Sequence, residues 1–401
     1  MNRVVITGLG PVSSIGVGSR DFCSALLAGR SGIARIESFD TSGFPYVNAG
    51  EVRDFSPGEI LTRLDPAQWG RSSQFAAAAA RLAVRDAGLD PGRVAPGRAG
   101  AVVGTTSGES QVIEALTAQL VAGGWAAMSS ELLDRVPADR LSNAVNLELG
   151  FAGESVTVCT ACSASNYALG YAYDILAMGE ADVMIAGGAD SVCRWAHAGF
   201  YRLGALTEHA CAPFDRDRSG IITGEGGAAL LLETLQHAEA RRARIYAEVL
   251  GYGLNCDASH MVSPDAASIA ACMRLAHRRA GVKPADIDYI SAHGTGTLAN
   301  DAVEAQAIFE VFGAAPPPVS STKSMLGHTM GAASGFGAIA STLAIDRGFL
   351  PPTINWTTQD PALIGLDPVA NTARQARVRV VQNDGFAFGG NNAIVIIGAL
   401  T

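Results

Sequence analysis

The sequence predicts an α/β protein built from two similar halves, and three observations lead to that fold class. Short β-branched runs alternate with Ala- and Leu-rich stretches along the chain, which is typical of strands covered by helices. At 401 residues the chain exceeds the usual size of a single core, and 48% of its residues are apolar. The same order of strand, small-residue turn and helix recurs later in the chain, so we expect an ancient duplication.

The elements of the first half follow from local composition. Runs rich in Val and Ile predict strands, and the Ala- and Leu-rich runs between them predict helices. The expected strands are Val4–Thr7, Ala101–Val103, Val156–Val158 and Val183–Ala186. The expected helices are Phe22–Leu27, Gln74–Ala87 and Ser163–Met178.

The second half repeats this order. The expected strands are Ala247–Tyr252, Ile287–Ser291 and Val319–Ser321, and the expected helices are Ala266–Ala280, Asp301–Phe312 and Gly331–Ile345. Arg377–Val381 and Ala393–Ile397 are expected to form a hairpin across a Gly-rich turn. We place the boundary near Gly251, with residues 1–250 in one half and 251–401 in the other. No linker marks it, so we expect the halves to pack closely.

Composition excludes several classes of function. A net charge of -9 without a run of Lys or Arg argues against general nucleic-acid binding. The most apolar stretch, Met330–Ile345, is too short to span a bilayer, and the N-terminus predicts a strand rather than a signal peptide. Seven dispersed cysteines do not form a disulfide framework or a metal-ligand pattern. These features are typical of a reduced, cytoplasmic protein that does not bind a membrane.

The segment around Cys162 predicts a nucleophile. The strand Val156–Val158 runs through small residues into a helix, so Cys162 should lie at a helix N-terminus. The helix dipole stabilises a thiolate there and lowers its pKa below the ordinary value of about 8.5. A buried packing role for Cys162 is the structural alternative. Cys159, on the expected strand, is interpreted as a core residue.

Two histidines follow strands in the second half. His293 begins the sequence HGTGT, and His328 ends STKSMLGH just before a predicted helix. Lys323 lies in the second segment and is one of only two lysines, the other being Lys283. Either histidine alone could be structural. Together with Cys162 on equivalent turns they predict a site with a thiol and two imidazoles.

A Gly-rich turn near the C-terminus supplies a further feature. Gly385–Asn392 reads GFAFGGNN, and its glycines allow backbone amides to approach a ligand closely. Exposed amides of this kind can hold an oxyanion. The turn is not a phosphate loop, because the GxxxxGK[ST] pattern is missing and no helix follows.

Taken in order, these segments resemble the β-ketoacyl-(acyl carrier protein) synthases, especially the synthase II type and the ketosynthases of type II polyketide systems. The resemblance covers nearly the whole chain and includes seven motifs. They are VVITGLG, ADVMIAGGAD (Ala181–Asp190), PFDRDRSGIITGEGG (Pro213–Gly227), DASHMVSP (Asp257–Pro264), HGTGT, STKSMLGH and FAFGGNN. It implies a thiolase-like fold in which two βαβαβ halves form a layered αβαβα core.

The resemblance also implies roles for individual residues. Cys162 matches the acyl-accepting nucleophile, and His293 and His328 match the pair that promotes decarboxylation. Lys323 matches the site lysine, for which Glu304 is the expected acidic partner. The remaining assignments concern substrate binding. The amides of Cys162 and Phe388 match the oxyanion hole, the Phe388 ring matches the gate, Thr295 and Thr297 match the phosphopantetheine contacts, and Ser107 and Phe200 are assigned to the substrate pocket.

The implied reaction is a decarboxylative condensation of an acyl chain on Cys162 with a malonyl carrier. It needs no metal or redox cofactor, and the phosphopantetheine arm comes with the acyl carrier protein. The family implies a homodimer, and a heterodimer with a chain-length partner stays open. Carrier docking requires a local basic patch, for which Arg63, Arg71 and Arg202 are the candidates.

Three departures from ordinary fatty-acid synthases favour a specialised pathway. The gate reads Asp384-Gly385-Phe386-Ala387-Phe388, Ser107 replaces an aliphatic pocket residue, and Asp134–Arg140, expected near the partner subunit, is unusually charged. Two alternative functions are disfavoured. A degradative thiolase acting on coenzyme A esters is disfavoured because such enzymes replace one histidine by a second cysteine. A non-catalytic chain-length partner would lack the nucleophile.

Overall fold

The computed structural model describes all 401 residues and confirms the α/β fold class. Ten strands form the main path of one large mixed sheet. In the first half they are β1 (Val4–Ser13), β5 (Ala99–Gly104), β6 (Ser155–Val158), β7 (Val183–Asp190) and β9 (Gly226–Thr234). In the second half they are β10 (Ala247–Cys256), β11 (Tyr289–Ser291), β12 (Val319–Ser320), β15 (Val380–Phe386) and β16 (Asn391–Gly398).

The helices fall into the same two groups. The first half contains α1 (Ser19–Ala28), α2 (Pro57–Ile60), α3 (Arg71–Asp86), α4 (Ser110–Gly123), α5 (Ser130–Leu133), α6 (Arg140–Leu149), α7 (Ala164–Met178), α8 (Arg194–Arg202) and α9 (Leu235–Ala240). The second contains α10 (Ala266–Ala280), α11 (Leu298–Phe312), α12 (Lys323–Leu326) and α13 (Ala333–Arg347). The short peripheral strands are β2 (Gly16–Val17), β3 (Ala34–Arg35), β4 (Asn48–Gly50), β8 (Thr223–Gly224), β13 (Phe349–Leu350) and β14 (Arg374–Gln375).

The sheet records an internal duplication. Its order is β12-β11-β15-β16-β10-β1-β9-β7-β5-β6, so each half arranges its own strands in the same sequence outward from the junction of β1 and β10. In both halves the inner pairs are antiparallel and the outer pairs are parallel. A register shift also occurs at the equivalent place in β1 and β10. The second repeat starts with β10, and this strand crosses the predicted boundary near Gly251.

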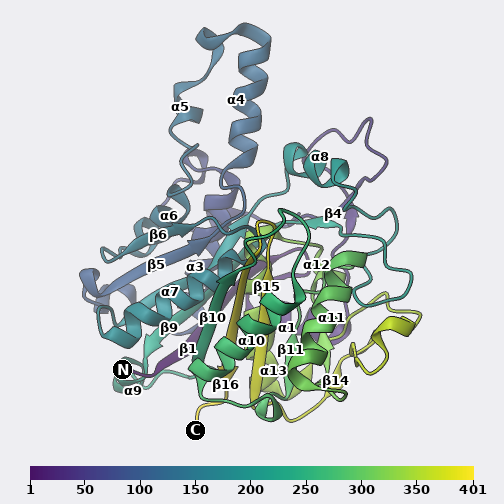
Figure 1. The fold of residues 1–401 in the computed structure, drawn as a ribbon. Helices are drawn as coiled ribbons and strands as arrows, with labels where there is room; N and C mark the ends of the chain where they lie inside the picture. Colours follow the sequence, from purple (N-terminus) through teal and green to yellow (C-terminus); the bar gives the residue numbers. More distant parts are fainter.

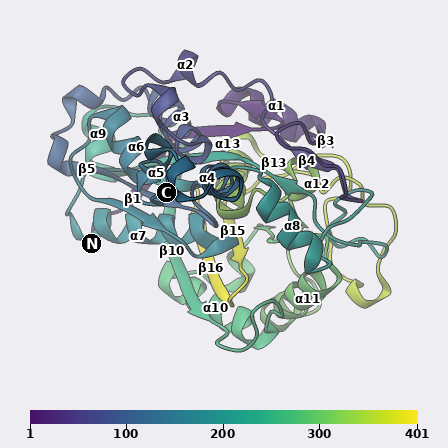
Figure 2. The same cartoon turned by 90° about the horizontal axis from the view of Figure 1, so that it is seen from above.

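The helices complete the expected αβαβα layering (Figures 1 and 2). Helices α3 and α6 cover the outer face of the first half, and α10 and α11 cover that of the second. Between the two halves of the sheet lie α7 and α13, which also pack against each other. Helix α13 is buried from Ala333 to Ala344, because its Ala, Gly and Ser residues allow strands to approach it from both sides.

Several elements of the first half were not predicted, among them helices α6, α8 and α9, strand β9 and the α4–α5 hairpin. Strand β9 is buried at all nine positions, but its GGAALLLET sequence has no β-branched run. The hairpin formed by α4 and α5 projects far from the body (Figure 1). Its tip carries Val121 and Trp125, which are 82% and 80% exposed. No helix in the structure combines the length and hydropathy needed to cross a membrane.

Candidate active site

Cys162 lies in the turn that the sequence predicts. Strand β6 ends at Val158, a 3₁₀ turn spans Ala161–Ser163, and α7 begins at Ala164. Ala161 has a left-handed φ of 50°, and the equivalent turn before α13 repeats this geometry at Met330, with φ 51°. The two turns are linked, because Ser165 donates to the carbonyl of Gly331 and Ser334 donates to the carbonyl of Cys162.

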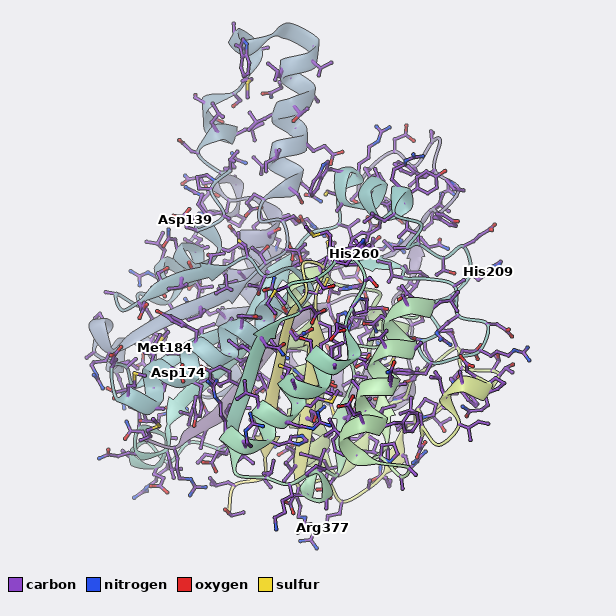
Figure 3. All side chains as sticks on the ribbon, in the orientation of Figure 1. Asp139, Asp174, Met184, His209, His260 and Arg377 are labelled. Carbon is purple, nitrogen blue, oxygen red and sulfur yellow. The ribbon has the colours of Figure 1, made fainter.

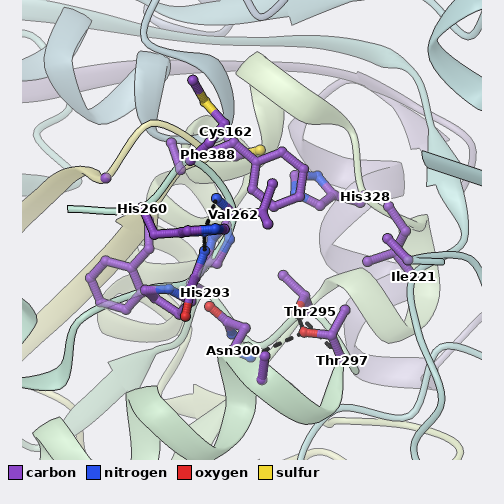
Figure 4. A pocket seen from close by; sticks show the side chains of 18 of the residues that line it. Cys162, Ile221, His260, Val262, His293, Thr295, Thr297, Asn300, His328 and Phe388 are labelled. Atoms are coloured by element: carbon purple, nitrogen blue, oxygen red, sulfur yellow. Dashed lines mark hydrogen bonds between the residues drawn. The ribbon is translucent and has the colours of Figure 1, made fainter. Parts of the chain in front are cut away.

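One cavity brings together the thiol and both predicted histidines (Figure 4). His293 follows β11, and His328 follows α12, so each ring reaches the site from the C-terminal end of a strand or its turn. Their ring centroids lie 5.6 Å apart at an interplanar angle of 80°. Both side chains are buried. Residues far apart in the chain therefore meet at one chemical site, as predicted.

Both imidazoles are neutral, and Nδ1 of the buried His293 ring has no hydrogen-bond partner in the protein. Burial lowers the pKa of His293 and of His328 well below the ordinary value, and the charge of Lys323 lowers both further. The amide of Met330 donates to Nδ1 of His328 over 3.0 Å. Nδ1 is therefore an acceptor, so the proton of the neutral ring resides on Nε2. His328 can donate that proton in a hydrogen bond to an oxygen in the cavity.

The predicted ion pair between Lys323 and Glu304 is not formed. The ammonium of Lys323 donates to the carbonyl oxygen of His293. The Glu304 carboxylate accepts from the amides of His293 and Gly294, each over 2.7 Å. Lys323 thus binds a carbonyl of the His293 turn and Glu304 binds its amides, so the two groups interact only through their charges. Burial lowers the pKa of Lys323 and raises that of Glu304 to about 7.

The prediction of a lowered thiol pKa is wrong. Burial raises the pKa of Cys162 to about 12, which outweighs the opposing effects of Lys323 and the backbone amides of Cys162 and Phe388. A helix N-terminus stabilises a thiolate by a partial charge, whereas complete burial removes its hydration. At rest the thiol is protonated beside neutral histidines. The amides of Cys162 and Phe388 nevertheless both favour negative charge at this position.

This electrostatic environment predicts the pH dependence of alkylation. Because the pKa of Cys162 lies above the working range, its reaction with iodoacetamide is expected to accelerate about tenfold per pH unit from roughly pH 7 to 9 without a plateau. Lys323→Met should slow alkylation at every pH, since the lysine charge lowers the thiol pKa. Mass spectrometry of the Cys162 peptide gives the rate. Lys283→Met, at an exposed lysine, is the control. A plateau below about pH 9 would contradict the burial argument.

Aromatic side chains close the mouth of the cavity. Phe388 follows β15, is 37% exposed and lies 6.1 Å from Phe200, measured between ring centroids. Phe200 in turn lies 6.4 Å from His328. The loop holding Phe388 is joined to a second loop by the bond from the amide of Gly389 to the carbonyl of Met261. Both predicted residues therefore line the cavity, and Phe388 is placed where it can cover it.

Thr295 and Thr297 line the same cavity from the turn before α11 (Figure 4). Their hydroxyl oxygens are 2.9 Å apart. The turn is fixed by Asp301, which accepts from the amides of Thr295 and Gly296. Asp301 was not singled out from the sequence, although its place on the helix after HGTGT resembles that of Glu304. Two hydroxyls beside an apolar wall suit the amides of an extended arm.

Ser107 does not line the cavity, contrary to the prediction. Its amide and hydroxyl both donate to Asp190, at 3.2 and 3.4 Å. The buried carboxylate of Asp190 therefore fixes this loop to the end of β7. The segment Asp257–Pro264 instead contributes the largest group of lining residues that were not predicted, including His260 and Val262. The sequence contained it as a motif of the resemblance, without a chemical pattern that assigns it a role.

The three candidate docking arginines do not form one patch. Arg71 makes an ion pair with buried Glu225 at 2.5 Å and lies over the Phe75 ring, so its interpretation as a free surface cation is wrong. Arg63 is exposed and lies against Gly150 at the end of α6. Arg202 is exposed at the end of α8, two positions after Phe200, which lines the cavity.

Comparisons with protein families match most of the chain. The family described as "Beta-ketoacyl synthase, N-terminal domain" matches residues 1–238, and "Beta-ketoacyl synthase, C-terminal domain" matches residues 246–357. A 3-oxoacyl-[acyl-carrier-protein] synthase 2 from Coxiella burnetii is 39% identical over 98% of each chain. A chloroplastic 3-oxoacyl-[acyl-carrier-protein] synthase I from Hordeum vulgare is 36% identical over 98% of this chain and 88% of its own.

Solved structures agree in fold over the full length. A chain of "The ishigamide ketosynthase/chain length factor" superposes with a TM-score of 0.98 at 51% identity, covering 100% of both chains. A β-ketoacyl synthase from Burkholderia phymatum gives 0.94 at 35% identity with the same coverage. A type II polyketide ketosynthase solved with its acyl carrier protein, AntDE:AntF, gives 0.92 at 31% identity, again over both full chains.

Proposed function

The chain belongs to the β-ketoacyl synthase family, and from that membership we propose that it extends acyl chains in a specialised polyketide pathway rather than in housekeeping fatty-acid synthesis. It is an acyltransferase that catalyses acyl-carrier-protein-dependent condensation. The observation that carries the pathway proposal is the 51% identity, over both full chains, to a ketosynthase/chain length factor. The 3-oxoacyl-[acyl-carrier-protein] synthase 2 from Coxiella burnetii is 39% identical. Fatty-acid elongation is the second candidate.

The first proposed step loads Cys162. Its sulfur attacks the thioester carbonyl of an acyl carrier, and the amides of Cys162 and Phe388 stabilise the oxyanion, since both already favour negative charge beside the sulfur. The acyl group moves to Cys162, and the thiol proton leaves with the carrier's sulfur. In this proposal no protein-bound metal or redox group is needed. The phosphopantetheine arm lies against Thr295 and Thr297.

The second proposed step forms the carbon–carbon bond. A malonyl carrier enters, and loss of carbon dioxide leaves an enolate whose oxygen accepts hydrogen bonds from His293 and His328. Neutral donors suit this task, because they stabilise developing negative charge without giving up their protons. The carbanion attacks the acyl carbonyl on Cys162. The sulfur leaves, takes up a proton, and the β-ketoacyl product departs on the carrier.

A partner subunit is part of the proposal. Strand β6 is the last strand of the sheet and has one unpaired edge, and the tip of the α4–α5 hairpin exposes Val121 and Trp125. We propose that a second ketosynthase-fold chain covers these surfaces, either another copy or a chain-length partner. Light scattering of the purified chain distinguishes them, since only self-association gives a dimer without a second gene product. A cytoplasmic location is proposed as well, and seven unpaired cysteines support it.

The pathway proposal predicts which donors load Cys162. The purified protein is incubated with carriers bearing medium saturated, unsaturated or oxygenated acyl chains, and the mass added to the Cys162 peptide is followed in time. We expect unsaturated or oxygenated chains to load about tenfold faster, which corresponds to a modest difference in pocket contacts. Cys162→Ala controls for labelling elsewhere. A preference for medium saturated chains would overturn the pathway proposal but not the reaction class.

A further inference from the structure

We propose that Asp190 is a positioning residue that holds the turn after His328 and thereby aims its imidazole at the reacting oxygen. The inference rests on the proposed function, and it adds a residue that touches neither substrate nor thiol. Asp190 ends β7 and is completely buried. It is the only charged residue of AGGAD, and no role was predicted for it from the sequence.

The carboxylate joins three segments around the site. Its Oδ2 accepts from the amides of Thr106 and Gly331, each over 2.7 Å. Its Oδ1 accepts from the Thr105 hydroxyl over 2.7 Å and from the Ser107 amide over 3.2 Å. Thus the loop after β5 and the turn before α13 are both fixed to the end of β7. The oxygens of Asp190 thus act as acceptors for backbone amides and hydroxyls.

The turn held by Asp190 is the one that orients His328. The amide of Met330 donates to Nδ1 of His328, and the next amide, that of Gly331, donates to Asp190. Met330 adopts a left-handed φ of 51°, a conformation that a non-glycine residue keeps only when its surroundings hold it. If the bond to Gly331 is lost, this turn can relax. The Met330 amide then no longer fixes which nitrogen of His328 faces the cavity.

An electrostatic role for Asp190 is the competing explanation. Its charge raises the pKa of the Cys162 thiol, although burial has the larger effect. Burial likewise raises the pKa of Asp190 itself to about 6, so its charge is only weakly maintained near neutrality. Substitution by asparagine separates the explanations. Asp190→Asn removes the charge and keeps a carbonyl oxygen for Gly331 and Thr106. Its NH₂ faces the Thr105 hydroxyl, which can accept, and only the longer bond from the Ser107 amide is lost.

The test compares Asp190→Ala with Asp190→Asn in the full-length protein. Acyl loading of Cys162 and decarboxylation of a malonyl carrier are measured separately. Asp190→Ala is expected to lower the kcat for decarboxylation about 100-fold, the effect of losing one aligned donor, with KM for the carrier unchanged. Loading should change by no more than about threefold, because the Cys162 turn also has contacts that do not involve Gly331. Ser163 donates to the carbonyl of Thr160, and the Asn166 side chain, just after the turn, donates to two carbonyls of β15 and β16. Asp190→Asn should retain most of the decarboxylation rate.

Several outcomes would overturn the inference. They are equal losses in both half-reactions, an unchanged kcat in Asp190→Ala, or Asp190→Asn behaving like Asp190→Ala. If Asp190→Ala does not fold, Asp190→Ser takes its place with the same expected split. Spectra of ¹⁵N-labelled histidine provide an independent measure, since the Nε2–H signal of His328 should persist in Asp190→Asn and be lost in Asp190→Ala or Asp190→Ser. A wild-type protein that decarboxylates nothing would instead refute the proposed function.

Discussion

Replacing Cys162 by alanine is expected to abolish acyl loading and to lower condensation by at least about 10⁴-fold, the scale of losing a nucleophile. Cys162 is the only cysteine that lines the cavity between the two histidines. No other thiol can therefore accept the chain there. Intact-protein mass spectrometry measures loading, and product formation from acyl and malonyl carriers measures condensation.

The chain supplies a matched control for this substitution. Cys159 lies three positions earlier on the same segment and is exposed, not buried in the core as the sequence suggested. Cys159→Ala should keep loading within about twofold of wild type, as expected for a surface change. Malonyl decarboxylation should persist in Cys162→Ala, because the two histidines do not require the sulfur. Full condensation by Cys162→Ala would refute covalent catalysis at this residue.

Removing either histidine is expected to lower decarboxylation and condensation by about 10²- to 10³-fold, the effect of losing one preorganised donor to an oxyanion. His328→Ala removes the Nε2–H donor that the Met330 amide fixes. His293→Ala removes the ring 5.6 Å away, between centroids. Acyl loading should survive both changes, since the amides of Cys162 and Phe388 serve that step. Carbon dioxide release from malonyl carrier and loading of Cys162 are the two measurements.

His260 is the matched control for the histidine variants. It lines the mouth of the same cavity but is exposed, at the end of the body from which the α4–α5 hairpin projects (Figure 3). Its Nδ1 accepts from the amides of Val262 and Ser263 in its own loop. His260→Ala should therefore change decarboxylation by less than about fivefold. Equal losses of decarboxylation in His260→Ala, His293→Ala and His328→Ala would contradict a specific role for the two buried histidines.

Much of the fold could be predicted because both halves repeat strong local patterns. The expected helix at Ala266–Ala280 has the same bounds in the structure, and the turn at Cys162 has the predicted strand and helix on either side. Strand β9 was missed because Gly, Ala and Leu carry no strand preference, and burial on both faces decides its conformation. The sequence pattern also did not predict the α4–α5 hairpin, whose tip is exposed in the isolated chain.

The sequence predicted the main residues of the site correctly, but it predicted the thiol pKa and several hydrogen-bond partners less well. Cys162, His293 and His328 meet as expected, because strand ends in equivalent repeats meet at one edge of a sheet. The thiol pKa was wrong in direction because a local sequence gives the helix terminus but not the depth of burial. Ser107 was misplaced, and Lys323 and Glu304 were wrongly paired, for a related reason. Buried polar groups form hydrogen bonds with backbone groups that are distant in the sequence, and these partners are known only once the chain is folded.

The two linked turns explain why a molecule made of two copies of one unit has a single nucleophile. Gly331 occupies the place in the second copy that Cys162 occupies in the first. A β-carbon at Gly331 would lie 2.5 Å from Cα of Thr105, so no thiol can be accommodated there. The close packing of the two copies therefore makes their equivalent turns unequal. The first turn carries the nucleophile, and the second can only support it.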